Sequence, residues 1–119
     1  MIDGIGIDVV DIKRFQESLE RTPNLESKLF TESERGKSIQ SMAARFAAKE
    51  AVIKALGGEP GIEWHGIEVG KESSGKPVIW LHGSTAKVAL QAGVRKLHVS
   101  ISHDGDSAVA FVVAEGELL

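Results

Sequence analysis

Asp8 is a carboxylate in a segment that is otherwise apolar or glycine, Gly4-Ile5-Gly6-Ile7-Asp8-Val9-Val10. A buried carboxylate without a partner is costly, so two interpretations of Asp8 stay open. Either its side chain faces solvent on a half-exposed sheet, or it binds a hard cation such as Mg²⁺, which prefers oxygen ligands. The neighbouring glycines would let a second group approach such a cation closely. The segment alone does not favour the cation site over the solvent-facing carboxylate.

Glu50 and Lys54 lie four residues apart in an alanine-rich segment, so they share one face of a predicted helix. Phe46 lies on the same row, and Arg45 and Lys49 form a neighbouring basic row. An exposed Glu–Lys pair at this spacing stabilises a helix by only about 0.2–0.5 kcal/mol, and the spacing alone favours that interpretation. The flanking residues are small or apolar, however, which indicates a helix covered on most sides and unfavourable for fully solvated charges.

His103 continues the apolar face of a predicted strand in which residues 97, 99 and 101 are apolar. Either it is a hydrogen-bonded histidine that closes the core, or it is a phosphate donor or acid/base at a strand end. The following Asp104-Gly105-Asp106 is typical of a tight turn, which we favour over a carboxylate metal cluster. Gly75-Lys76-Pro77 is a second turn, and it forms either a plain surface hairpin or part of an anion site.

Alternation and capping signals predict the elements of the N-terminal half. Residues 2–10 alternate as a strand with Ile5, Ile7 and Val9 on one side and a glycine-lined face on the other. Asp11 can cap a helix over residues 12–21, and a short helical turn is expected over 25–29. Thr31-Glu32-Ser33-Glu34 has the spacing of a capping box, so a helix should begin at Glu32.

The strongest helical pattern covers residues 40–56 and ends at Gly57-Gly58. Its expected core face consists of Met42, Phe46, Ile53 and Leu56. Short strands are expected over residues 67–69, 78–81, 96–102 and 107–114, with Ser84 as the cap of a helix that ends near Gly93. Early helices and late strands predict a single α+β domain over residues 1–119, with a mainly antiparallel sheet packed on the long alanine-rich helix.

Length and charge narrow the classes of function. A chain of 119 residues fits one compact domain and has little room for a deep active site of its own, so a site between subunits is expected. A net charge of −3 disfavours nucleic-acid and anionic-membrane binders. Absence of cysteine excludes disulfides, zinc–thiolate sites and cysteine nucleophiles. The sequence shows neither a signal-peptide pattern nor a run of 18 apolar residues, and we expect a cytoplasmic protein.

Five segments, spread in order over nearly the whole chain, together resemble the sequence pattern of a known protein family. They are Gly4-Ile5-Gly6-Ile7-Asp8 with Val9-Val10-Asp11-Ile12-Lys13-Arg14, Phe30-Thr31-Glu32-Ser33-Glu34, Arg45-Phe46-Ala47-Ala48-Lys49-Glu50-Ala51 with Lys54-Ala55-Leu56-Gly57, Gly75-Lys76-Pro77, and Val99-Ser100-Ile101-Ser102-His103. Together they resemble the holo-[acyl-carrier-protein] synthase family, the small 4′-phosphopantetheinyl transferases. This resemblance implies the fold of that family, assembled as a homotrimer with its sites at the subunit seams.

The resemblance also implies a reaction of lipid metabolism, in fatty acid biosynthesis. Coenzyme A donates its 4′-phosphopantetheine group to a serine of apo acyl-carrier protein, leaving 3′,5′-ADP. Asp8 and Glu50 would be the protein ligands of Mg²⁺, and Lys54 would contact phosphate, so these three are the expected catalytic residues. Arg45, His103 and the turn Gly75-Lys76-Pro77 would contact the nucleotide, from the same subunit or a neighbouring one.

Two further expectations concern the group that accepts the serine proton and the surface on which the carrier protein docks. Glu50, or a metal-bound water that it orients, is expected to take the proton of the serine. Carrier proteins are acidic, but the helix over residues 12–21 combines three basic and two acidic side chains. Either the carrier docks through Arg14 with more contact to Phe15 and Phe46, or its surface is less acidic, as in a carrier domain of a larger synthase.

Two other classes of function stay open. The chain could be a non-catalytic coenzyme A or nucleotide-binding module of the same fold, or a scaffold in which Asp8, Glu50 and His103 are incidental. The presence of both carboxylates argues against the binding module, because such a module has less need of two metal ligands.

Overall fold

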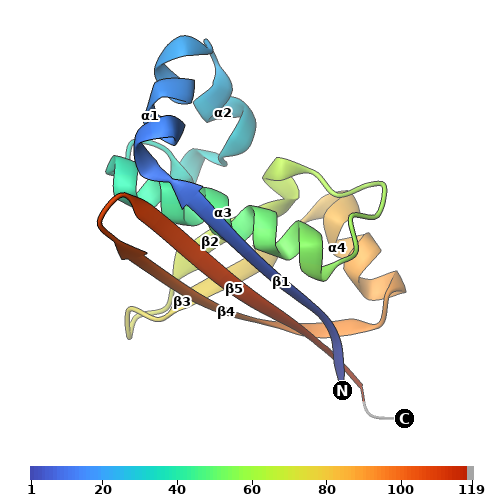
Figure 1. Cartoon of the computed structure of the whole chain (residues 1–119). Helices are drawn as coiled ribbons and strands as arrows, with labels where there is room; N and C mark the ends of the chain where they lie inside the picture. Colours follow the sequence, from blue (N-terminus) through green and yellow to red (C-terminus); the bar gives the residue numbers. More distant parts are fainter. Residues whose placement is uncertain (118–119) are drawn as a thin grey trace.

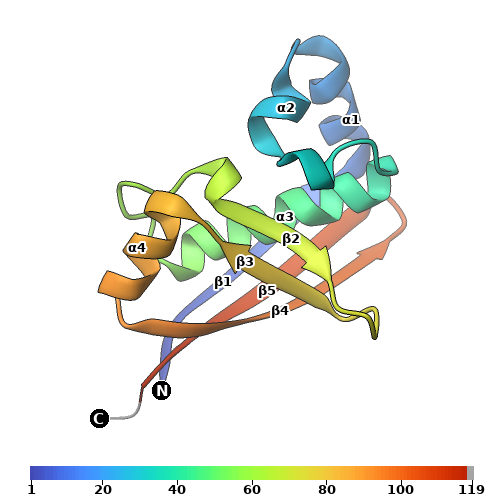
Figure 2. The ribbon, with the colours of Figure 1, turned by 180° about the vertical axis from the view of Figure 1, so that it is seen from behind.

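The computed structural model describes residues 1–117, in which a long helix lies between two small antiparallel sheets (Figures 1 and 2). In chain order the elements are β1 (Ile2–Asp11), α1 (Ile12–Arg21), α2 (Leu25–Leu29), the 3₁₀ turn η1 (Glu32–Glu34), α3 (Ile39–Ala55), the 3₁₀ turn η2 (Trp64–Gly66), β2 (Ile67–Lys71), β3 (Pro77–Leu81), α4 (Gly83–Gln91), β4 (Val94–Asp104) and β5 (Ser107–Gly116). The larger sheet has the order β1-β5-β4, and the smaller one pairs β2 with β3. The predicted α+β class, the antiparallel sheet and its packing on the alanine-rich helix are confirmed.

The glycine-lined face of β1 is the face that packs on α3. A Cβ atom on Gly6 would lie 1.8 Å from the carbonyl oxygen of Ala51, and one on Gly4 would lie 1.9 Å from that of Ala55. Only glycine therefore lets the strand approach the helix this closely. Asp8 follows on the same face of the strand and is brought against the helix with the glycines. The opposite face, with Ile5, Ile7 and Val9, is exposed.

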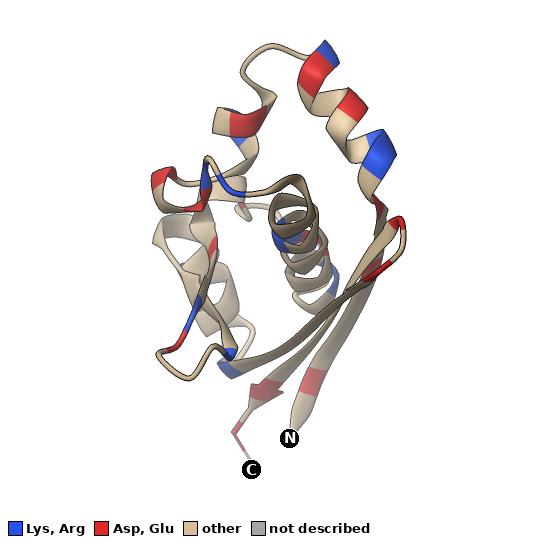
Figure 3. Cartoon of the chain, turned by 90° about the vertical axis from the view of Figure 1, so that its left-hand side faces the viewer, with Lys and Arg blue, Asp and Glu red and all other residues tan. Residues whose placement is uncertain are grey.

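Helix α3 is covered on nearly all sides, as its alanine content indicates. Met42 and Leu56 of the expected core face are buried, whereas Phe46 and Ile53 are half-buried. The predicted face was too narrow, because the small residues on the other faces are buried as well. These are Ala43, Ala44, Ala47, Ala48, Ala51 and Ala55. Figure 3, which looks along α3, shows the larger sheet curving beneath and beside the helix and the β2–β3 pair on its other side.

Several local predictions can be compared directly with the structure. Asp11 caps α1 and accepts a hydrogen bond from Arg14 N at 2.9 Å. The capping box is present, since Glu34 accepts from Thr31 N at 2.8 Å, but only the 3₁₀ turn η1 follows it. Ser84 is not a helix cap: α4 begins after His82, and the Ser84 hydroxyl donates to the carbonyl oxygen of Gly61 at 2.7 Å.

No helix within residues 1–117 combines the length and the apolar character needed to cross a membrane.

Candidate active site

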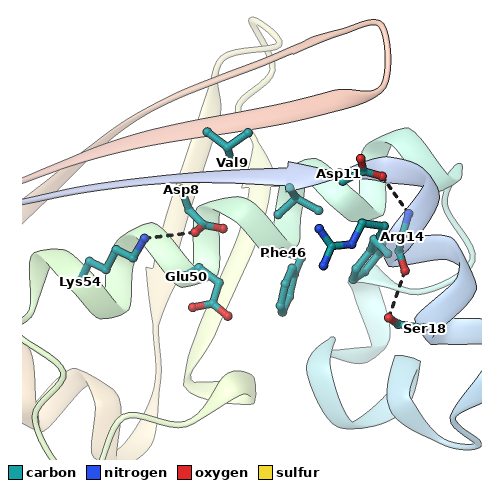
Figure 4. A pocket seen from close by; sticks show the side chains of 10 residues that line it. Asp8, Val9, Asp11, Arg14, Ser18, Phe46, Glu50 and Lys54 are labelled. Atoms are coloured by element: carbon teal, nitrogen blue, oxygen red, sulfur yellow. Dashed lines mark hydrogen bonds and ion pairs between the residues drawn. The ribbon is translucent and has the colours of Figure 1, made fainter.

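A pocket of about 530 Å³ lies where β1, α1 and α3 meet, and its inner wall is acidic (Figure 4). We call it the acidic pocket; it is lined by Asp8, Val9, Val10, Asp11, Arg14, Phe15, Ser18, Phe46, Glu50 and Lys54. Asp8 reaches it from β1, while Glu50 and Lys54 reach it from α3. The three residues expected to be catalytic therefore share one pocket, although more than forty positions separate the first two in the sequence.

Lys54 pairs with Asp8 and not with its helix neighbour Glu50. Its Nζ lies 3.1 Å from Asp8 Oδ1 and donates to the carbonyl oxygen of Ile7 at 2.9 Å. The Asp8 side chain is only 18% exposed, against 53% for Lys54. Asp8 is therefore not a solvent-facing carboxylate, and the described residues contain no Glu50–Lys54 surface pair.

Glu50 sits in an environment that opposes its negative charge. Burial raises the pKa of its carboxyl, the charge of Asp8 raises that pKa further, and only the ammonium of Lys54 lowers it. A carboxyl whose ionisation is opposed by burial and by a neighbouring carboxylate suits a divalent cation, which would offset the negative charge of the pair.

The same pair of carboxylates fits Mg²⁺ by its donor chemistry. Mg²⁺ is usually held by one or two carboxylates and completes its shell with phosphate oxygens and water. Within residues 1–117, no group of three or more acidic or histidine side chains is placed to hold a metal ion. Asp8 and Glu50 thus suit an ion that shares its remaining ligands with a bound phosphate compound.

Aromatic rings form the apolar side of the acidic pocket. Phe15 and Phe46 stack with their centroids 5.1 Å apart, and Phe46 lies 5.6 Å from Trp64. Phe15 is only 6% exposed, so it offers its ring to a group that enters the pocket and not to a flat surface contact. Arg14 is exposed on α1, and Figure 4 shows its guanidinium directed into the pocket.

A second pocket, of about 320 Å³, lies between the N-terminal part of α3, the β2–β3 hairpin and β4. We call it the basic pocket; it is lined by Ser38, Gln40, Ser41, Ala44, Arg45, Gly70, Lys71, Gly75, Pro77, Ile101 and His103. It gathers four of the residues expected to contact the nucleotide, namely Arg45, Gly75, Pro77 and His103, but not Lys76. His103 is exposed, so it does not close the core.

The two pockets open on different sides of α3. Arg45 and Glu50 are five residues apart, which corresponds to about 140° around a helix. A single chain therefore keeps the predicted nucleotide contacts apart from Asp8 and Glu50.

A buried ion pair beneath the basic pocket was not predicted from the sequence. Lys49, which the helical pattern assigned to a basic row with Arg45, is fully buried, and its Nζ lies 2.8 Å from Glu34 Oε1. Burial lowers the pKa of Lys49, and the hydrogen bond and charge of Glu34 oppose that shift. The capping-box spacing pointed to Glu34, but nothing local indicated that its carboxylate would also meet a lysine from α3.

Comparisons with known proteins place the chain in one family over nearly its whole length. A family model described as the 4′-phosphopantetheinyl transferase superfamily matches residues 4–112. The holo-[acyl-carrier-protein] synthases of Clavibacter sepedonicus and Leifsonia xyli are 54% and 53% identical to this chain, over 98% and 97% of its length and 98% of theirs. The crystal structure of the Neisseria meningitidis synthase superposes with a TM-score of 0.89 at 32% identity, covering 97% of this chain and 99% of that one. The Helicobacter pylori synthase in complex with coenzyme A gives 0.83 at 30% identity, covering 93% and 99%.

Proposed function

The chain belongs to the 4′-phosphopantetheinyl transferase superfamily, as a holo-[acyl-carrier-protein] synthase, and we propose that its acidic pocket is the reaction centre. The enzyme transfers 4′-phosphopantetheine from coenzyme A to a serine of apo acyl-carrier protein and releases 3′,5′-ADP. The observation that carries the assignment of the centre is the convergence of Asp8, Glu50 and Lys54 on one pocket from two elements.

The reaction moves a phosphoryl group from one oxygen to another. The serine oxygen forms a bond to the β-phosphorus of coenzyme A, and the bond from that phosphorus to the oxygen of 3′,5′-ADP breaks. Such transfers depend on positioning and charge stabilisation more than on covalent chemistry. Mg²⁺ held by Asp8 and Glu50 would neutralise part of the charge of the diphosphate.

In the acidic pocket, Glu50 accepts a proton and Lys54 stabilises the phosphate. Glu50 takes the serine proton, directly or through a water, because its carboxylate lies in the pocket that receives the serine. Lys54 contacts the phosphate and stabilises the negative charge that develops on departing 3′,5′-ADP. Its partly exposed ammonium is already oriented towards the site by Asp8 and the carbonyl oxygen of Ile7.

The basic pocket of a neighbouring copy holds the nucleotide end of coenzyme A. Arg45 and His103 supply donors for phosphate, and Gly75 and Pro77 of the turn supply the adjoining wall. Because the two pockets of one chain open on different sides of α3, one coenzyme A molecule is better served by pockets of two copies. This supports sites at subunit seams.

The outer face of the larger sheet supports assembly as a homotrimer. Ile5, Ile7 and Val9 of β1 are exposed, and β1 pairs with β5 so that Ile7 lies opposite the exposed Phe111. A contiguous apolar surface of this kind marks an interface. Three copies related by a closed rotation would cover it and bring neighbouring pockets together.

The carrier protein docks at the mouth of the acidic pocket. Basic side chains lie at the two ends of α1 and acidic ones between them (Figure 3), so a uniformly basic surface is absent from this helix. Arg14 provides the charged contact, while Phe15 and Phe46 provide the apolar wall behind it. Fatty acid biosynthesis in the cytoplasm is the setting that this activity implies.

A mass measurement on the carrier protein tests the proposal. Apo acyl-carrier protein incubated with coenzyme A, Mg²⁺ and this chain should gain the mass of one phosphopantetheine, and a chelator should abolish the gain. The Asp8→Asn chain should give no gain under the same conditions. Binding of coenzyme A without a mass gain would instead identify a non-catalytic binding module.

A further inference from the structure

The free edge of strand β2 is closed by charged side chains and not by another strand. Within the described residues β2 pairs only with β3. On its other edge, Val69 N donates to Glu34 Oε2 at 2.8 Å and Val69 O accepts from Arg45 Nη1 at 2.7 Å. Ile67 O accepts from Lys49 Nζ. Buried backbone groups must be paired, and here three side chains from η1 and α3 do so.

Glu34 and Lys49 are the centre of this arrangement, and both are fully buried. An ammonium group has three N–H donors. Those of Lys49 meet Glu34 Oε1 at 2.8 Å, Trp64 O at 2.9 Å and Ile67 O. A buried polar network with every member satisfied is rigid and specifies one arrangement. The pair therefore fixes the spacing between η1, α3 and β2.

The strand held in this way leads into one wall of the basic pocket. The β2–β3 hairpin, seen in front of α3 in Figure 2, contributes Gly70, Lys71, Gly75 and Pro77 to the lining. Arg45 faces these residues from α3. Its Nη1 is bound to Val69 O, and its Nε donates to Ser41 Oγ at 3.3 Å. Strand β2 thus orients the Arg45 guanidinium through Val69 O and also leads into the hairpin residues that line the basic pocket opposite Arg45.

We propose that the buried Glu34–Lys49 pair positions the coenzyme A site, by holding the β2–β3 hairpin and the Arg45 guanidinium at the spacing that the nucleotide end requires. This inference rests on the proposed function of the basic pocket. Neither Glu34 nor Lys49 belongs to the lining of the basic or the acidic pocket within the described residues. Both are positioning residues, so their loss should weaken coenzyme A binding without changing the chemistry at saturating coenzyme A.

Calorimetric titration with coenzyme A, together with the transfer assay, tests the proposal. Glu34→Gln should raise the Kd for coenzyme A about 10- to 100-fold, as expected for misplaced binding groups, and leave kcat at saturating coenzyme A unchanged. The double variant Glu34→Leu/Lys49→Met leaves no unpaired buried charge and should fold; it should show the same loss of affinity. Wild-type affinity in both variants would overturn the proposal.

A matched control separates positioning from simple destabilisation. Leu29→Ala removes a buried side chain of α2 that lines neither pocket, so it should lower the melting temperature and keep the Kd for coenzyme A. If Leu29→Ala weakens binding as much as Glu34→Gln, the role of the pair is only structural and the proposal is wrong.

A double-mutant cycle with Arg45 tests the route of the effect. In an Arg45→Ala background, Glu34→Gln should weaken coenzyme A binding further by much less than in the wild type, because the coupled group is gone. Additive losses would overturn the proposal. If the wild-type chain binds coenzyme A but transfers nothing, the proposed function is wrong. If the wild-type chain transfers the group and the Glu34→Gln variant binds coenzyme A with wild-type affinity, only this inference is wrong.

Discussion

Glu50 is held where burial and the neighbouring Asp8 make its ionised form less favourable. The Asp8 charge raises the pKa of Glu50, and Lys54 offsets only part of the effect. In the proposed Mg²⁺ site the same juxtaposition would be favourable, because a bound cation would be attracted by both carboxylates. Free of the ion, Glu50 is a carboxylate with enhanced basicity next to a fixed ammonium.

Glu50→Gln tests this role at the level of one side chain. Removal of a general base should lower kcat by about 10²- to 10⁴-fold at saturating Mg²⁺. At limiting Mg²⁺, the wild-type rate should fall as the pH decreases through the raised pKa of Glu50, because the protonated carboxyl neither holds the ion nor accepts a proton. A pH–rate profile should show this acid limb in the wild type and lack it in the variant. Near-normal turnover of Glu50→Gln would exclude Glu50 as the base.

The sequence predicted that Asp8, Glu50 and Lys54 lie together but not what Lys49 contacts. Asp8, Glu50 and Lys54 could be assigned to one site through a resemblance spread over five segments, and the structure places them together. The helical pattern placed Lys49 only on a basic row with Arg45, because helical periodicity says which residues share a row and not which row is covered. Its burial depends on Glu34 and on β2, which reach it only through the tertiary fold.

At the level of elements, the contact between β1 and α3 sets the geometry of the acidic pocket. Gly6→Ala would place a Cβ atom 1.8 Å from the carbonyl oxygen of Ala51, so strand and helix must separate. We expect a loss of about 1–3 kcal/mol in the free energy of unfolding. A higher Mg²⁺ concentration for half-maximal transfer should accompany it, because Asp8 moves away from Glu50.

Val112→Ala is the control for this substitution. Val112 is buried on the helix-facing side of β5, and its truncation weakens the same layer without forcing β1 outwards. It should therefore lower stability and preserve the Mg²⁺ dependence. An unchanged Mg²⁺ dependence in Gly6→Ala would show that the close approach of β1 does not position Asp8.

A second contact between η1 and β2, besides that of Glu34 with Val69, is the hydrogen bond from Ser33 to Glu68. Hydrogen bonds from Ser33 and His82 lower the pKa of the Glu68 carboxyl, and His82 Nε2 lies 2.8 Å from its Oε1. A depressed native pKa means stability that is present above the ordinary value of 4.5 and lost as the pH falls through the native pKa. Glu68→Gln should therefore cost up to about 1 kcal/mol at neutral pH.

Urea unfolding at several pH values measures this effect. The difference in unfolding free energy between wild type and Glu68→Gln should shrink as the pH falls below 4.5. Glu72→Gln, in the exposed turn between β2 and β3, should change little at any pH. A difference that is independent of pH would mean that the Glu68 carboxylate is not what binds η1 to β2.

Strands and helices could be predicted where their residues follow a local pattern, but the residue that caps a helix could not always be predicted in this way. Alternation located β1 and the alanine-rich pattern located α3 to within a residue. Ser84 has a favourable type for a cap, but the chain reaches α4 directly from β3, so His82 takes the N-cap position. The division of the predicted site between two pockets could not be predicted from local patterns, because it follows from how β1, α1 and the β2–β3 hairpin lie around α3.

At the level of the whole molecule, the exposed apolar face of the larger sheet and the separation of the acidic and basic pockets both favour assembly as a homotrimer. Ile7 is 54% exposed at the middle of that face. Ile7→Glu should leave the fold of the single chain intact and convert a trimer to monomers, with loss of transfer activity. Sedimentation velocity measures the assembly, and Leu90→Glu, at a 64% exposed position of α4, should remain trimeric and active. A trimeric Ile7→Glu chain would place the interface elsewhere.

The most direct test of a reaction centre shared between copies is complementation of two inactive chains. Asp8→Asn lacks a working acidic pocket and Arg45→Ala binds coenzyme A weakly, so at a coenzyme A concentration near the wild-type Kd each alone should be almost inactive. Co-assembled in equal amounts, they form some seams at which both pockets are intact. Transfer activity should return to roughly a quarter of the wild-type value, the fraction of such seams in randomly mixed trimers. Mixed assemblies that remain as inactive as the separate chains would contradict the shared site.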